Sequence, residues 1–168
     1  VAAAQAEREL LEQAAAALGV PLEQVADAAS KLMDERKELR TRVTTLEKEL
    51  AEGRAGELAA ERIGSVNLYI NDCGDAPLAE MQELARRLSA SGEALVLLAT
   101  RAGGKGHVMA VRGGKVEVDC SALAGAAAKA AGGSGGGAPT HAKGAVPTDR
   151  AGEALEALVT AARKALEK

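Results

Sequence analysis

Hydrophobic positions in the first third of the chain recur at helical spacing. The pattern predicts a helix over residues 3–18, within a run of strong helix formers. Its apolar face is formed by Leu10, Leu11, Ala14, Ala17 and Leu18. Gly19 is placed to end this helix, and Pro21 suits the first turn of the next one. The second helix is expected from about residue 22 to about residue 63, unless Gly53 and Gly56 interrupt it.

The second predicted helix carries a hydrophobic stripe whose steps alternate between four and three residues. The stripe consists of Val25, Ala29, Leu32, Arg36, Leu39, Val43, Leu46 and Leu50. This a/d spacing is typical of coiled coils, and Arg36 interrupts it once. Two arrangements are open: a helical hairpin in which the first helix covers part of the stripe, or a coiled-coil arm. The first helix is too short to cover residues 39–50, so we expect another copy of the chain, or another domain of a parent protein, to cover the rest. The expected dimerisation residues are Leu32, Leu39, Val43, Leu46 and Leu50.

From residue 64 onward, strand-like and helix-like patterns alternate. Period-two alternation predicts a strand over residues 66–71, and an amphipathic pattern predicts a helix over 77–90. The segments expected after these are a central strand at 93–99, a Gly-rich turn at 102–106, a strand at 107–112, its hairpin partner at 115–118 after Gly113-Gly114, a helix at 122–131 capped by Ser121, a loop at 132–147, and a last helix capped by Thr148 or Asp149. The expected class is α+β or α/β, with helices packed on a small mixed sheet beside a Gly-rich loop.

Charge and composition change at the same point of the chain. Residues 1–63 carry nine basic and thirteen acidic side chains, whereas residues 64–168 carry twelve and eleven. Glycine is sparse before Gly64 and frequent after it. We therefore expect a helical dimerisation subdomain at 1–63 and a globular α/β subdomain at 64–168.

Composition and the polar residues exclude several classes of function. Tyr69 is the only aromatic residue among 168, which argues against base stacking on single-stranded nucleic acid. No apolar run approaches the roughly 18–20 residues that cross a bilayer, so no membrane partner is expected. Two cysteines cannot build a disulfide framework, which fits a reducing cytoplasm. There is no Gly-x-Ser-x-Gly elbow and no cysteine with a histidine nearby in sequence, so the chain is not expected to be an enzyme. Metal and cofactor are not expected either, since the soft ligands are irregularly spaced: Cys73, His107, Cys120 and His141.

A Gly-rich, basic stretch is the strongest binding signal in the sequence. Residues 132–137 read GGSGGG, and residues 101–145 carry six basic side chains against two acidic ones. The glycines are those of a flexible linker, or of a tightly wrapped backbone whose N–H groups form a nest for phosphate. The surrounding charge favours contact with a phosphate backbone. The candidate residues are Arg101, Lys105, Lys129, Gly133, Gly135, Gly136, Gly137, His141 and Lys143. We expect the glycines among them to serve backbone shape more than direct contact.

Two motifs give the chain a family resemblance. A helix of small residues ends in Lys-x-x-Gly-Gly and is followed by Gly-Gly-Gly-x-Pro and an alanine. These residues are Lys129, Gly132, Gly133, Gly135, Gly136, Gly137, Pro139 and Ala142. The second motif is the Gly-Val-Pro entry between two helices at residues 19–21. The chain thereby resembles the C-terminal domain of alanyl-tRNA synthetases, called C-Ala, whose globular half is the DHH-associated domain that some phosphoesterases share.

The resemblance implies a noncatalytic module. In this family the helical part commonly supports dimerisation, and the globular part binds the outer corner of tRNA, where the D and T loops meet. The implied partners are alanine tRNA, a second copy of the chain, and the aminoacylation and editing domains of a parent synthetase, which would use ATP, Mg and Zn. Two alternatives stay open: a purely structural oligomerisation or interdomain module, and the substrate-phosphate-binding half of a DHH-type phosphoesterase. The latter would need an Asp-His-His metal domain, which this sequence lacks.

Overall fold

The chain consists of two compact units, residues 1–46 and residues 47–168. The computed structural model describes the backbone of residues 2–167 and the side chains of residues 4–50, 53 and 58–167.

The first unit is helical. Helix α1 (Ala2–Leu18) ends at Gly19, whose φ is +66°, and the Val20 N–H donates to the Ala15 carbonyl at 3.1 Å. This is a glycine C-cap, as the sequence predicted. A 3-10 turn, η1 (Leu22–Gln24), follows Pro21 and leads directly into the long helix α2 (Val25–Glu57), which continues into the second unit.

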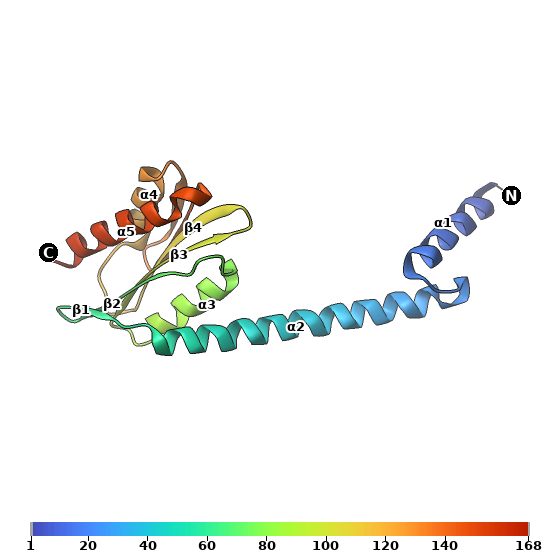
Figure 1. Ribbon diagram of the computed structural model, residues 1–168, viewed down its shortest axis with the longest axis horizontal. Coiled ribbons are helices and arrows are strands. Elements are labelled where there is room, and N and C mark those ends of the chain that lie inside the picture. Colours follow the sequence, from blue (N-terminus) through green and yellow to red (C-terminus); the bar gives the residue numbers. More distant parts are fainter. Residues whose placement is uncertain (1, 168) are drawn as a thin grey trace. The chain divides into compact units, whose positions relative to one another are not determined.

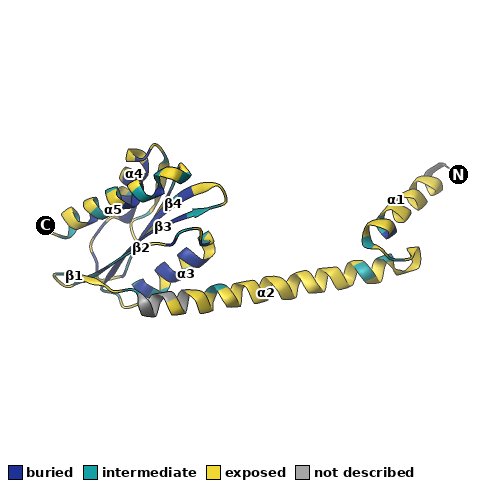
Figure 2. Cartoon of the chain, in the orientation of Figure 1, coloured by how far each residue is buried: buried dark blue, intermediate teal, exposed yellow. Residues whose placement is uncertain are grey.

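The hydrophobic stripe of α2 is exposed. Its leucines and Val43 are about half exposed or more, with Leu39 at 63%, and Val25 is intermediate. Most of α2 is correspondingly coloured as exposed in Figure 2. Leu10 and Leu11 of α1 are exposed as well, so α1 does not bury its apolar face on this stripe. Of the two arrangements that the sequence left open, the structure has the long arm and not the hairpin.

The second unit is built on a six-stranded mixed sheet with the order β1-β2-β3-β4-β6-β5. The strands are β1 (Glu61–Ile63), β2 (Val66–Asp72), β3 (Ala94–Ala102), β4 (Lys105–Arg112), β5 (Ser134–Ala138) and β6 (His141–Val146). Strands β2 and β3 run parallel and are joined by helix α3 (Leu78–Ser89), whereas all other neighbours are antiparallel. The expected fold class is confirmed.

Helices cover both faces of the sheet but not all of it (Figure 1). Helix α3 lies on one face, and helices α4 (Cys120–Ala130) and α5 (Ala151–Leu166) lie on the other. Alternation along β3 sends Val96 and Leu98 toward α3, and Leu95 and Leu97 toward α4 and α5, with all four fully buried. On the α3 side, no helix in the described part of the chain packs on β5 and β6, and His141 and Lys143 are exposed there.

Two elements differ from the sequence prediction. The second helix does not reach residue 63. It ends at Glu57, because residues 61–63 pair with residues 66–68 across a turn at Gly64, whose φ is +60°. Residues 115–118 do not form a strand. Gly113-Gly114 makes a turn, but not a hairpin, because the free edge of β4 is already occupied by β6.

The predicted helix caps are also corrected. Asp119, not Ser121, caps α4: its Oδ1 accepts hydrogen bonds from the backbone N–H of Ser121 at 2.9 Å and of Ala122 at 3.2 Å. Neither Thr148 nor Asp149 caps the last helix. Both lie in a 3-10 turn, η2 (Thr148–Arg150), that precedes α5.

Candidate functional site

The Gly-rich segment folds as a β-hairpin at the edge of the sheet. The segment predicted as a loop at 132–147 contains β5 and β6, which pair antiparallel with Gly135 opposite Gly144 and Gly136 opposite Lys143. A Cβ added to Gly135 would lie 3.0 Å from the Ala124 carbonyl oxygen, and one added to Gly144 would lie 2.5 Å from the Ala128 Cβ. Helix α4 therefore lies so close to the hairpin that glycine is required beneath it.

This geometry corrects both expectations for the glycines. Residues 134–138 form a paired strand, so they are neither a flexible linker nor a nest of N–H groups turned to one side. Backbone shape is the role of three of them, since a Cβ on Gly133, Gly135 or Gly137 would meet neighbouring backbone atoms. Gly136 differs, because a Cβ there would have no neighbour within 4 Å.

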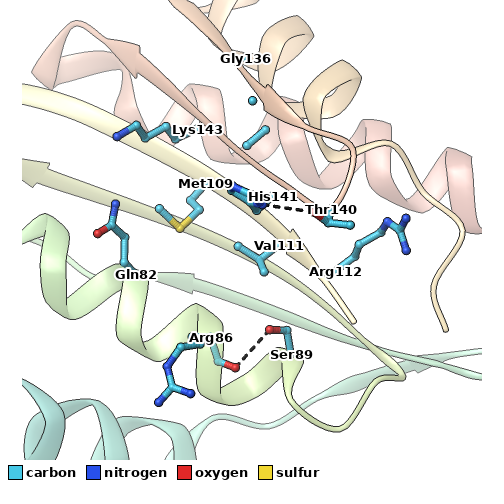
Figure 3. Close-up of a pocket in the computed structure, with 12 residues that line it drawn as sticks. Gln82, Arg86, Ser89, Met109, Val111, Arg112, Gly136, Thr140, His141 and Lys143 are labelled. Atoms are coloured by element: carbon cyan, nitrogen blue, oxygen red, sulfur yellow. Dashed lines mark hydrogen bonds between the residues drawn. The ribbon is translucent and has the colours of Figure 1, made fainter. Parts of the chain in front are cut away.

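A groove lies on the other side of the hairpin, between α3 and strands β4, β6 and β5 (Figure 3). Its volume is about 600 Å³. Met109 and Val111 of β4 lie between the α3 side chains and those of the hairpin. The other lining residues are Gln82, Arg86, Ser89, Arg112, Gly136, Gly137, Thr140, His141, Ala142 and Lys143.

The side chains of β4, β5 and β6 that point to the α3 side form a surface that we call the open face. Strand register places on it Lys105, His107, Met109, Val111, Ser134, Gly136, Ala138, His141, Lys143 and Ala145. None of these residues is acidic. Lys105 and Lys143 are exposed, and within the described part of the chain neither is paired with a carboxylate. The open face thus offers two available ammonium groups and no competing negative charge.

Three nearby arginines are held in internal contacts instead. Arg101 donates to both carboxylate oxygens of Asp72, at 2.8 and 2.7 Å, and this hydrogen bonding lowers the pKa of Asp72. Arg86 makes a bidentate pair with Glu83, at 2.8 and 2.6 Å, which lowers the pKa of Glu83 to about 2. Arg112 donates to the backbone carbonyls of Pro139 and Val116. These three guanidinium groups therefore stabilise the fold through contacts within the chain.

The structure brings together only some of the predicted contact residues. Lys105, Gly136, His141 and Lys143 share the open face. Arg101, which directly precedes the predicted Gly-rich turn, lies on β3 and is paired with Asp72. Gly137 also lines the groove, whereas Lys129, Gly133 and Gly135 lie on the α4 side.

Sequence analysis did not predict several of the residues that line the groove. Gln82, Arg86 and Met109 are brought beside the hairpin only by the packing of α3 and β4, so no local pattern points to them.

The possible soft metal ligands are separated. Cys73 is buried in the core cluster on the α3 side, and Cys120 in the cluster on the α4 and α5 side. Among the described residues there is no group of three or more His, Cys, Asp or Glu that could hold a metal. In the same part of the chain, no helix is long and apolar enough to span a membrane.

Comparison with known proteins finds similarity to alanine–tRNA ligases from three organisms. No protein-family model matches the chain. It is 32% identical to the alanine–tRNA ligase of Pyrococcus abyssi over 92% of this chain and 17% of that protein. It is 30% identical to the ligase of Pyrococcus furiosus, over 90% of this chain and 16% of that protein. It is 36% identical to the ligase of Gluconobacter oxydans, over 59% of this chain and 11% of that protein. The chain therefore spans about a sixth or less of the length of these relatives.

A solved structure shares the fold. The C-Ala domain from Aquifex aeolicus alanyl-tRNA synthetase superposes with a TM-score of 0.53 and 23% sequence identity. The match covers 60% of this chain and 95% of that domain.

Proposed function

We propose that this chain is a tRNA-binding and dimerisation module of an alanyl-tRNA synthetase. The premise is that its homologues are alanine–tRNA ligases and that its fold is that of a C-Ala domain. In this role the globular unit contacts the elbow of alanine tRNA. It thereby helps the aminoacylation and editing domains of the parent act on one tRNA in the cytoplasm. The module itself is noncatalytic, and ATP, Mg and Zn belong to those other domains.

The open face is the observation that carries the RNA-binding half of the proposal. Lys105 and Lys143 are exposed cations that no carboxylate among the described side chains neutralises, and His107 and His141 lie on the same face. Ammonium groups on such a surface bind phosphates as point charges. The only aromatic residue, Tyr69, is half-buried against the core cluster beneath α3. Recognition therefore relies on phosphates and on the shape of the RNA rather than on base stacking.

The stripe on α2 supports the dimerisation half. Monomeric proteins rarely expose a contiguous row of large apolar side chains, and such rows mark interaction sites. On α2 the row is Leu32, Leu39, Val43, Leu46 and Leu50, each about half exposed or more.

Binding of alanine tRNA transcript across a salt series tests the RNA-binding half. We expect the full tRNA to bind better than a hairpin of similar charge that has no elbow. We also expect affinity to fall steeply with salt, and exchange of Lys105 and Lys143 for Glu to weaken binding and reduce the salt slope by roughly one for each lysine. Lys164→Glu is the matched control, since Lys164 is an exposed lysine on α5, away from the open face. Equal binding of wild type and the double variant would leave the purely structural module as the function.

A further inference from the structure

Both histidines of the chain lie on the open face. The sequence of 168 residues contains only His107 and His141. His107 is half-buried on β4, on the same side of the sheet as Met109, and His141 is exposed on β6, opposite Val111. Imidazole is the side chain whose charge ordinarily changes between about pH 5 and pH 8. The positive charge that histidine adds to this chain as the pH falls is therefore confined to the open face.

The two histidines lie beside the two exposed lysines of this face. On each of two strands, a histidine is two residues from a lysine, so the two side chains point to the same side of the sheet. The pairs are Lys105 with His107 on β4, and His141 with Lys143 on β6. Lys143 lies opposite Met109, which makes His107 its diagonal neighbour across the two strands. Neighbouring members of this basic cluster are thus roughly 7–8 Å apart at their Cα atoms.

Carboxylates on the neighbouring elements do not pair with the histidines. The charged groups on the elements that pack beside the basic cluster are Glu80, Glu83, Arg86 and Arg87 of α3, Arg101 of β3, Arg112 of β4, and Asp72 and Asp75 at the end of β2 and in the loop after it. Glu83 is bound by two arginines of its own helix, and Asp72 by Arg101. Within the described part of the chain, no ion pair joins either histidine to a carboxylate. His141 contacts the Thr140 hydroxyl through Nδ1, at 3.2 Å, so Nε2 is the atom that can donate to a phosphate oxygen.

We propose that His107 and His141 bind phosphates of the RNA as imidazolium groups, which couples RNA binding by the open face to the uptake of protons from the solvent. The proposal deepens the RNA-binding half of the proposed function and rests on it. A phosphate beside an imidazole stabilises the charged form of the ring, so the complex holds more protons than the free chain and the free RNA. By linkage, the affinity for RNA rises as the pH falls. At high pH the lysines of the basic cluster hold the RNA without the histidines.

Isothermal titration calorimetry of the full chain with alanine tRNA transcript counts the protons. The titrations are run at pH 7 in PIPES, HEPES and Tris, because the heat of binding changes with the ionisation enthalpy of the buffer in proportion to the protons taken up. We expect the wild type to take up about one proton more than the double variant His107→Gln, His141→Gln. This difference excludes protons that the RNA itself exchanges. Thr160→His in the double variant is the matched control, since Thr160 is exposed on α5, and it should not restore uptake.

The dissociation constant at pH 6 and pH 8, at one low salt concentration, is the second readout. At about 1.5- to 5-fold for each imidazolium contact, the wild type should bind about 2- to 25-fold more tightly at pH 6. The double Gln variant should bind at both pH values as the wild type does at pH 8, whereas His107→Lys with His141→Lys should keep the tight binding at pH 8. His141→Gln alone, at an exposed position, should remove part of the effect without disturbing the fold.

Two kinds of negative result are distinguishable. RNA binding that is equally tight at pH 6 and pH 8, or proton uptake that is equal in the wild type and the double Gln variant, would overturn the role of the histidines while leaving RNA binding through the lysines intact. RNA binding at neither pH would refute the RNA-binding half of the proposed function itself, and the role of the histidines with it.

Discussion

Gly135 and Gly136 are adjacent on β5 but face opposite sides of the hairpin, so alanine at each position should have opposite effects. A Cβ on Gly135 would lie 2.8 Å from the Gly144 Cα and 3.0 Å from the Ala124 carbonyl oxygen, both backbone atoms. Overpacking against such rigid neighbours costs about 1–3 kcal/mol. Loss of glycine flexibility in the unfolded chain returns about 0.4–1 kcal/mol. We expect Gly135→Ala to lower the free energy of unfolding by about 1–2 kcal/mol.

Gly136→Ala lacks the packing penalty, because no atom lies within 4 Å of the added Cβ. Only the unfolded-state effect remains, so the variant should be as stable as wild type or more stable by up to about 1 kcal/mol. Urea unfolding followed by circular dichroism at 222 nm measures both variants. Equal free energies of unfolding for the two variants would refute the argument that close approach of α4 explains the glycines.

Three further predictions concern other parts of the second unit. Arg101→Ala should lower the free energy of unfolding near neutral pH by no more than about 1 kcal/mol, because the pair is about a third exposed. Arg101 lowers the pKa of Asp72 in the folded protein, so the ion pair contributes its full stabilisation above the unfolded pKa of about 3.9. This stabilisation disappears as the pH falls through the folded pKa. In urea unfolding, the loss of free energy caused by Arg101→Ala should therefore be present at pH 7 and smaller at pH 2. Burial raises the pKa of the Cys120 thiol to about 11, so a thiol reagent at pH 8 should label it only after unfolding; rapid labelling of the native protein would contradict its burial. Asp119→Ala should cost about 1 kcal/mol in urea unfolding through loss of the α4 cap, whereas Ser121→Ala should cost little.

Elements with a strong local pattern were predictable from the sequence. The strand at 66–71, the helix at 77–90 and the strand at 93–99 all occur, within a few residues at each end. Helix α3 buries one amphipathic face, and β3 is a continuous apolar run that is buried on both sides of the sheet, so both patterns can be recognised locally. The Gly19 stop belongs to the same class, because a positive φ at a helix end is a local requirement.

Elements that depend on distant packing were not predictable. Glycines in residues 134–138 carry no side-chain alternation, so nothing local indicates a strand. That strand is defined by its pairing with β6, and a helix of small residues lies close above it. Residues 115–118 alternate like a strand, and Val116 and Val118 are buried, yet this segment finds no partner because β6 occupies the edge of β4.

In the candidate site, too, local patterns were predictable and contacts between distant segments were not. Once β6 is known to be a strand, period-two alternation places His141 and Lys143 on one face. Asp72 lies 29 residues before Arg101 in the chain, so no local sequence pattern predicts that the two residues pair. The sequence therefore pointed to the segment that forms the open face, but it gave Arg101 the role of an available cation.

The most direct test of the proposed function is a photo-cross-linking map on alanine tRNA. A photoreactive group is placed at position 143 on the open face, and separately at position 164 on α5 as the control. We expect cross-links from position 143 to nucleotides of the D and T loops, in higher yield than from position 164. Cross-links confined to the anticodon or acceptor end, or equal yields from the two positions, would contradict recognition of the tRNA elbow by the open face.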